Sequence, residues 1–171
     1  MNNIEIYIDN RERELIKLFK ENNINIILKN LEIGDIIYKE NEEVIYIIER
    51  KTFNDLGASI KDGRYKEQKI RLLSNSNENL FYILEGDLES CNTLNNKALL
   101  GSIINMIFRD NIKLIFSSNI NETYKILLQI KDKFNNGKFS KIINNNNSYT
   151  SSIKLNKKEN MTKLNCNIIQ L

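Results

Sequence analysis

Histidine and proline are missing from this chain of 171 residues, and cysteine is scarce. Without histidine the chain cannot form a Ser-His-Asp or Cys-His triad or a histidine-ligated metal site, so any catalysis must use carboxylates, lysine or hydroxyl groups. Cys91 and Cys166 lie far apart in the sequence, which argues against a disulfide framework and against zinc ligation. We therefore expect a reducing, intracellular environment.

Long apolar runs are also missing from the sequence. No segment approaches the roughly 18 consecutive apolar residues that a membrane-spanning helix needs. The N-terminus does not show the basic and then apolar layout of a signal peptide. We expect no membrane partner, and a location in the nucleus if the source is a cellular eukaryote or in the cytoplasm otherwise.

The charged residues are unevenly distributed along the chain. Residues 1–134 carry 19 Lys/Arg and 21 Asp/Glu, whereas residues 135–171 carry six Lys and one Glu. The larger part is therefore slightly acidic and the C-terminal part is basic. Contact with a nucleic acid must then come from a local basic patch or from the C-terminal part.

Strand-like and helix-like segments alternate over residues 4–134. Period-two alternation and short apolar runs predict the strands, and helical spacing of apolar residues predicts the helices. This order predicts an α/β domain with a mixed central sheet flanked by helices. The predicted strands are Ile4–Ile8, Ile24–Leu28, Ile36–Lys39, Val44–Lys51, Leu80–Glu85 and Lys113–Phe116; the predicted helices are Asn10–Glu21, a stretch from Thr52, Gly63–Leu73, Leu94–Phe108 and Glu122–Phe134.

The composition changes after Phe134. Residues 135–152 are rich in Asn and Ser, which predicts a flexible linker. Residues 153–171 form a basic tail that regains apolar residues near its end. We therefore predict one domain over 1–134, followed by the linker and the tail.

Charged side chains gather at the end of the predicted strand Val44–Lys51. Residues two apart in a strand share a face, so Glu49 and Lys51 point to one side and Arg50 to the other. Asp9 and Asp35 stand beside neighbouring predicted strands. Carboxylates are the ligands that Mg²⁺ and Mn²⁺ prefer, and phosphodiester hydrolysis uses such a cation. Three acids near one lysine therefore predict a metal-dependent phosphodiesterase site.

The same residues resemble the signature of the XPF/MUS-type structure-specific endonucleases, whose nuclease domain carries G-D…E-R-K-x-x-x-D. This chain has Gly34-Asp35 followed by ERKTFND over Glu49–Asp55. IDNRE at Ile8–Glu12 is similar to the first-strand motif of that family. SIKDGRYKEQKIRL at Ser59–Leu72 is similar to a helix of its MUS-type branch, and FYILEG to the next strand.

The resemblance implies a restriction-endonuclease-like, PD-(D/E)xK nuclease fold. It also implies magnesium-dependent incision of branched DNA, such as 3′-flaps and forks, in DNA repair or recombination. A homodimer, or a heterodimer with a related nuclease-fold subunit, is expected as well. Members of the family usually carry two helix-hairpin-helix motifs after this domain, and we expect this chain to lack them, since it ends at a segment resembling their lead-in.

The signature residues receive roles from the resemblance and from their chemistry. Asp9, Asp35 and Glu49 are predicted metal ligands, and Lys51 is the predicted catalytic amine. Arg50 belongs to the catalytic signature and either pairs with a structural carboxylate or contacts DNA. The metal ligands would accept either Mg²⁺ or Mn²⁺.

Three acids near the site have a second interpretation. Asp9 either binds metal or caps the first helix with Asn10. Glu12 either supports a second metal or is a first-turn helix charge. Asp55 follows Thr52 by three residues, a capping pattern that we favour over metal support.

Two helices also carry a functional prediction. Lys61, Arg64, Gln68 and Arg71 lie in a basic segment whose helical spacing predicts phosphate contacts, the alternative being a solvated surface helix. The Leu94–Phe108 helix is apolar on more than one face, which suits either a core helix or a dimer interface.

Competing functions of other kinds remain. A non-catalytic DNA-binding partner subunit would share the fold, but it has no need of three convergent charges. A restriction or recombination nuclease of the same fold would act on other DNA, and the DGRYKEQ segment makes it the weaker alternative.

Overall fold

The computed structural model describes residues 4–75 and 79–136. Contacts divide the chain into two units, Met1–Asp132 and Lys133–Leu171. Of the second unit only 133–136 belong to the described residues. The predicted linker and tail therefore lie outside the described part, apart from residues 135 and 136.

A six-stranded mixed sheet forms the centre of the first unit, in the order β2-β1-β3-β4-β5-β6. β3 runs antiparallel to both β1 and β4, whereas β1–β2, β4–β5 and β5–β6 are parallel pairs. The predicted mixed sheet is thus confirmed. The strands are β1 (Ile4–Asp9), β2 (Ile27–Lys29), β3 (Ile36–Glu40), β4 (Glu43–Thr52), β5 (Leu80–Glu85) and β6 (Lys113–Ser117).

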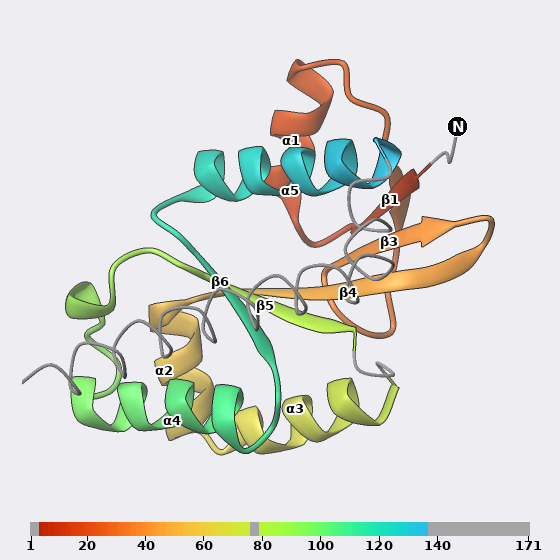
Figure 1. The fold of residues 1–171 in the computed structure, drawn as a ribbon. Helices are drawn as coiled ribbons and strands as arrows, with labels where there is room; N and C mark the ends of the chain where they lie inside the picture. Colours follow the sequence, from red (N-terminus) through yellow and green to blue (C-terminus); the bar gives the residue numbers. More distant parts are fainter. Residues whose placement is uncertain (1–3, 76–78, 137–171) are drawn as a thin grey trace, which may run out of the picture. The chain divides into compact units, whose positions relative to one another are not determined.

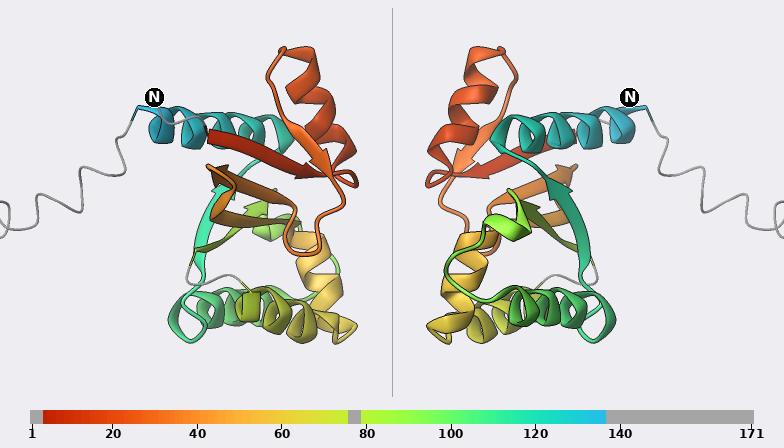
Figure 2. Two further views of the ribbon diagram at one scale, coloured as in Figure 1. Left: turned by 90° about the vertical axis from the view of Figure 1, so that its right-hand side faces the viewer. Right: turned by 90° about the vertical axis from the view of Figure 1, so that its left-hand side faces the viewer.

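Helices cover both faces of this sheet (Figure 1). α1 (Arg13–Glu21) and α5 (Ile120–Asn135) lie on one face. α2 (Phe53–Lys61), α3 (Arg64–Asn75) and α4 (Asn96–Phe108) lie on the other, as both views of Figure 2 confirm. A short 3-10 helix, η1 (Leu88–Ser90), follows β5.

The layer of α1 and α5 packs on the sheet through fully buried aromatic and aliphatic side chains. Phe19 of α1 meets the ring of Tyr124 edge-on, with 4.9 Å between the ring centroids. Tyr38 of β3 is fully buried, and its hydroxyl donates to the backbone oxygen of Leu127, 2.8 Å away. Burying each such side chain contributes about 1.5–3 kcal/mol. These contacts hold β3 in place beside the site.

The opposite layer has its own apolar cluster beneath β4 and β5. Each of its three helices contributes buried side chains to this cluster. The cluster includes Leu56, Leu72, Leu80, Tyr82, Leu84, Leu99, Ile103 and Met106.

Several element boundaries differ from the prediction. α1 begins at Arg13 rather than Asn10, because the Asp9 side chain bonds elsewhere and leaves no cap there. β2 begins at Ile27 rather than Ile24, since it is the parallel ladder with β1 that defines the strand. α4 begins at Asn96, because the Asn95 side chain caps it by accepting from Ala98 N.

Gly34 fixes the turn into β3. Its φ is +70°, a conformation that side-chain-bearing residues rarely adopt. A Cβ at this position would lie 2.6 Å from Cγ2 of Ile47 and 3.2 Å from the backbone oxygen of Ile48. The chain therefore needs glycine here to bring residue 35 against β4.

Candidate active site

The ends of β1 and β4 and the start of β3 meet at one edge of the sheet. Asp9 ends β1, and its backbone N–H donates to the backbone oxygen of Asp35 over 2.9 Å. The backbone N–H of Asp35 donates in turn to Ile48, also over 2.9 Å. The ladder thus brings the predicted acids on β1, β3 and β4 together, although they are far apart in the sequence.

Asp35 and Glu49 form a desolvated carboxylate pair. Burial, followed by the charge of Glu49, raises the pKa of Asp35 to about 7. Burial also raises the pKa of Glu49, although the charge of Lys51 opposes the shift. An oxygen of Asp35 accepts from the backbone N–H of Arg50 at 2.9 Å, which orients this carboxylate. Two such carboxylates gain from a divalent cation that neutralises both of them.

Asp9 is saturated with hydrogen bonds from within the chain. Its Oδ1 accepts from the backbone N–H and the Nε of Arg11, and its Oδ2 accepts from Nη2 of Arg11 and the N–H of Leu31. Burial alone would raise the pKa of Asp9, but the hydrogen bonds from Arg11 and Leu31 outweigh it and lower the pKa. Asp9 does not cap α1, whose N-cap is Glu12. Arg11 and Leu31 thus occupy both oxygens of Asp9.

Lys51 is held by two side chains on the same side of β4. Its Nζ donates to Oε1 of Gln68 at 3.0 Å and lies 3.8 Å from Oε1 of Glu49. The Glu49 and Lys51 side chains are only 16% and 11% exposed. Gln68, predicted to contact DNA, is therefore turned toward the site amine in this structure.

Arg50 points to the other face of β4 and forms an ion-pair cluster. Its guanidinium donates to both oxygens of Glu85 on β5, at 2.9 and 2.5 Å, and to Glu12 at 3.0 Å. Thr123 of α5 donates to Glu85 as well, at 2.6 Å. Of the two alternatives for Arg50, the structure favours pairing with structural carboxylates. Arg50 ties β4 to β5 and to the start of α1.

Glu12 serves as a partner of Arg50 in this cluster. Burial, then the charge of Asp35, raises its pKa, and the charge of Arg50 opposes this shift. Glu12 also precedes α1 as its N-cap residue, without a side-chain capping bond. In this conformation its carboxylate is turned to Arg50.

Asp55 adopts the capping role that its spacing predicts. Oγ1 of Thr52 accepts from the backbone N–H of Asp55 at 3.0 Å and donates to its carboxylate at 2.7 Å. The pair starts α2 directly after Lys51. Asp55 thereby supports the site through the backbone.

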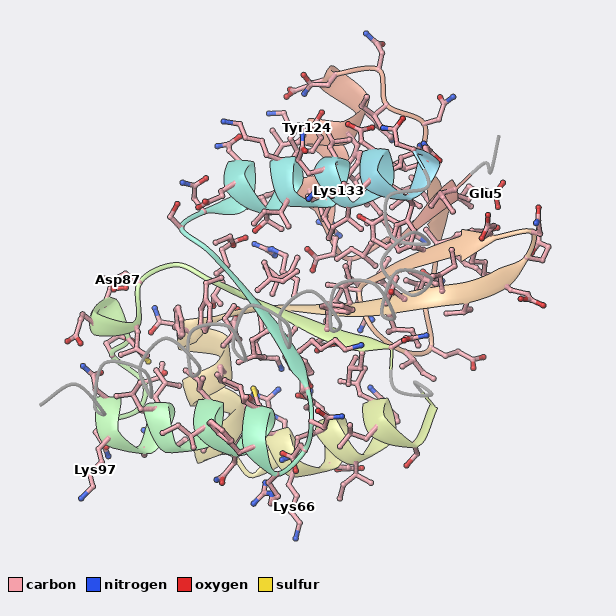
Figure 3. All side chains as sticks on the ribbon, in the orientation of Figure 1. Glu5, Lys66, Asp87, Lys97, Tyr124 and Lys133 are labelled. Atoms are coloured by element: carbon pink, nitrogen blue, oxygen red, sulfur yellow. The ribbon has the colours of Figure 1, made fainter. Side chains whose placement is uncertain are left out.

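The basic residues on α2 and α3 have different surroundings. Arg71 lies near the site, since its charge lowers the pKa of Glu49 after burial has raised it. Arg64 pairs with Asp62 at 2.9 Å on an exposed surface, and Lys61 is exposed at the end of α2. Lys66 of α3 extends away from the sheet (Figure 3).

A pocket of about 400 Å³ opens where β4, β5 and β6 end. Its lining includes the acids Glu14, Glu85 and Asp87 and contains no lysine or arginine. An acidic surface repels a phosphate backbone. Although Glu85 in this lining is paired with Arg50, the pocket lining offers acids and no basic residue to such a backbone.

Within 4–75 and 79–136, no group of three or more His, Cys, Asp or Glu is arranged to hold a metal ion. The donor chemistry of Asp35 and Glu49 suits a hard cation, whereas both oxygens of Asp9 are engaged by Arg11 and Leu31. Cys91 has a free thiol, and Cys166 lies outside the described residues. No helix of the described ranges combines the length and the apolarity that crossing a membrane requires.

Sequence reasoning missed two residues of this region. Arg11 and Glu85 received no role, although both make short ion pairs with predicted site residues. A basic residue two positions after Asp9 was a usable signal for the first pair. No local pattern links Glu85 to Arg50, which is 35 positions away.

The fold is found in solved nucleases. The structure of XPF from Aeropyrum pernix in complex with DNA matches with a TM-score of 0.64 and 24% identity, over 77% of this chain and 65% of that one. This likeness defines the chain as a restriction-endonuclease-like α/β fold of the XPF nuclease type. The ERCC4 domain model matches residues 8–130. The chain therefore belongs to the ERCC4 domain family, which includes XPF and MUS81.

Curated relatives agree with this family. A probable crossover junction endonuclease mus81 from Dictyostelium discoideum is 42% identical over 109 residues, which are 56% of this chain and 12% of that protein. The 3′-flap repair endonuclease Xpf from Saccharolobus solfataricus is 30% identical over 138 residues, 78% of this chain and 57% of that protein. The chain thus spans less than two thirds of these relatives.

Proposed function

We propose that this chain is a metal-dependent, structure-specific DNA endonuclease domain. It hydrolyses phosphodiester bonds in branched DNA, of the 3′-flap or fork type, in intracellular DNA repair or recombination. The observation that carries the proposal is the desolvated pair Asp35–Glu49 beside the held ammonium of Lys51. Membership of the ERCC4 domain family supports it.

Asp35 and Glu49 would hold Mg²⁺, or Mn²⁺ in its place, and Asp9 would join them after Arg11 moves. When bound, the cation supplies charge neutralisation and a water of lowered pKa. Lys51 presents a positive charge to the scissile phosphate, because Gln68 and Glu49 fix its ammonium. Arg50 positions β4 from the opposite face.

The basic residues of α2 and α3 contact the DNA backbone in this proposal. Lys61 and Arg64 are exposed, and Arg71 carries positive charge to the Glu49 side of the helix. Such contacts position the duplex without reading its sequence. The substrate is then selected by its branched shape.

Incision of labelled DNA tests the proposal. With Mg²⁺, the wild type should cut 3′-flap and fork substrates and leave plain duplex intact. Asp35→Ala and Lys51→Ala should each lower the rate by about 100-fold or more, because the first removes a ligand of the cation and the second removes a positive charge that faces the reacting phosphate. Glu43→Ala, at the far end of β4, and Lys97→Ala, which extends outward from α4 (Figure 3), are the matched controls.

An unchanged rate in Asp35→Ala or Lys51→Ala would overturn the site. The alternative function, a non-catalytic partner subunit, has one observation in its favour: Arg11 fills the Asp9 oxygens. That alternative requires branched DNA to bind without incision, and Mn²⁺ not to bind at all.

We also propose that a second copy of this chain covers an apolar surface on α4 and β6. Ile104 and Phe108 of α4 are 53% and 83% exposed, and Phe116 of β6, the edge strand, is 55% exposed. Leu100 and Ile107 extend the helical stripe. Large apolar side chains gathered on one helix and an open sheet edge are typical of a dimer interface.

A further inference from the structure

Arg11 is an exposed member of the candidate site. Its side chain is 75% exposed, whereas its partner Asp9 is 1% exposed. The guanidinium grips both oxygens of that carboxylate, with distances of 2.7 Å from Nε to Oδ1 and 3.1 Å from Nη2 to Oδ2. The exposed arginine thus binds the buried Asp9 carboxylate from the solvent side.

The positive charge of Arg11 acts on all three predicted metal ligands. The pKa of Arg11 is raised first by its hydrogen bond to Asp9 and by the charge of Asp9, and then by the charges of Asp35 and Glu49. In return, the charge of Arg11 offsets part of the rise that burial causes in the pKa of Asp35 and of Glu49. The guanidinium is therefore the counter-ion of the acid group as a whole.

We infer that Arg11 is a built-in competitor of the metal and a sensor of DNA. It stands in for the cation at Asp9 while the site is empty of substrate. A DNA backbone phosphate, a bidentate acceptor like a carboxylate, draws the exposed guanidinium outward and opens Asp9 to the cation. Metal and DNA then favour each other's binding, as linkage requires.

This inference rests on the proposed function, because it assumes that Asp9, Asp35 and Glu49 receive the cation. It assigns to this chain a positioning residue that keeps metal affinity low until DNA arrives. The exchange involves no covalent step. Arg11 replaces its ion pair with Asp9 by one with a phosphate, and Asp9 replaces Arg11 by the cation.

Mn²⁺ titration of the full chain, followed by electron paramagnetic resonance of the free ion, tests the competition. Arg11→Gln should bind Mn²⁺ about tenfold more tightly than the wild type, because two charge-assisted hydrogen bonds no longer oppose the ion. Arg13→Gln removes an exposed charge two residues away and should leave the affinity unchanged. The backbone donors of Arg11 and Leu31 still satisfy Asp9 in the variant, which protects the fold.

Binding of a 3′-flap DNA, measured by fluorescence anisotropy, tests the sensing. In EDTA, Arg11→Gln should bind nearly as the wild type does, because without a cation to replace Arg11 at the buried Asp9 the loss of that ion pair offsets the new contact with the phosphate. Ca²⁺ also takes oxygen ligands and should release Arg11 from Asp9 in the wild type. In Ca²⁺ the variant should therefore bind the DNA several-fold more weakly, because it lacks the arginine that would contact a phosphate. Arg11→Lys keeps the charge without the fork and should bind Mn²⁺ with intermediate affinity.

Each failure has its own signature. The inference is wrong if the wild type and Arg11→Gln bind Mn²⁺ with equal affinity, or if Arg13→Gln gains as much Mn²⁺ affinity as Arg11→Gln does. Incision of DNA by the wild type would show that the proposed function survives either result. Weaker DNA binding by Arg11→Gln in EDTA as in Ca²⁺ overturns the sensing. Absence of Mn²⁺ binding from every variant, together with absence of incision, overturns the proposed function itself.

Discussion

Asp35 titrates near neutral pH, because burial and the charge of Glu49 raise its pKa to about 7 from 3.8. The folded state therefore binds more protons than the unfolded state between these two values. The stability that protonated Asp35 contributes to the folded state is fully present below pH 3.8 and is lost as the pH rises through 7. In the metal-free protein, ionisation of Asp35 therefore destabilises the folded state.

Asp35→Asn should make the metal-free protein more stable at pH 8, by on the order of 2 kcal/mol. Near pH 4 the two proteins should be equally stable, because Asp35 is then protonated. Urea unfolding in EDTA at both pH values measures the difference. Glu32→Gln, an exposed acid three residues earlier, is the control. A variant less stable than the wild type at pH 8 would contradict the prediction.

Gln68 has two possible roles, support of Lys51 and contact with DNA, and the sequence alone does not distinguish them. Its Oε1 accepts from Lys51, so Gln68→Met should slow the chemical step about tenfold or more while DNA affinity stays constant. Gln68→Glu keeps the acceptor and should restore most of the rate. Single-turnover kinetics with a separate anisotropy titration distinguish the two quantities. Weaker DNA binding at an unchanged rate would instead support the predicted DNA contact.

At the scale of elements, local patterns succeeded where the deciding contacts are local. The alternation around Ile6 predicted β1, and the spacing of Thr52 and Asp55 predicted the cap of α2. The placement of Glu49 and Lys51 on one face, with Arg50 on the other, followed from strand geometry alone. These features depend on neighbours within a few residues.

The remaining elements depend on distant partners, and there the prediction was inexact or silent. The start of β2 is set by its pairing with Tyr7 of β1, about 20 positions earlier. The Lys51–Gln68 contact depends on how α3 packs under the sheet. The Arg50–Glu85 pair depends on the parallel β4–β5 ladder. No periodicity in the sequence carries this information.

At the scale of the whole molecule, the exposed stripe on α4 should control association. Ile104→Asp should weaken dimer formation by about 100-fold, since it places a charge in a buried contact. Light scattering over a concentration series measures the oligomeric state. Ile70→Asp on α3 is a matched control, because Ile70 is 52% exposed. A wild type that stays monomeric would contradict the proposal that a second copy covers this surface, and would point to a different partner there.

β4 divides its two faces between two tasks, and this division governs which length changes the chain tolerates. Inserting or deleting one residue between Tyr46 and Arg50 would move Arg50 to the face that Lys51 now occupies and reverse every later side chain. The hairpin turn and the bulge where Tyr38 and Lys39 face Val44–Tyr46 can accept an extra residue without that exchange. Homologous chains should therefore vary in length at the hairpin tip and stay gapless along the rest of β4.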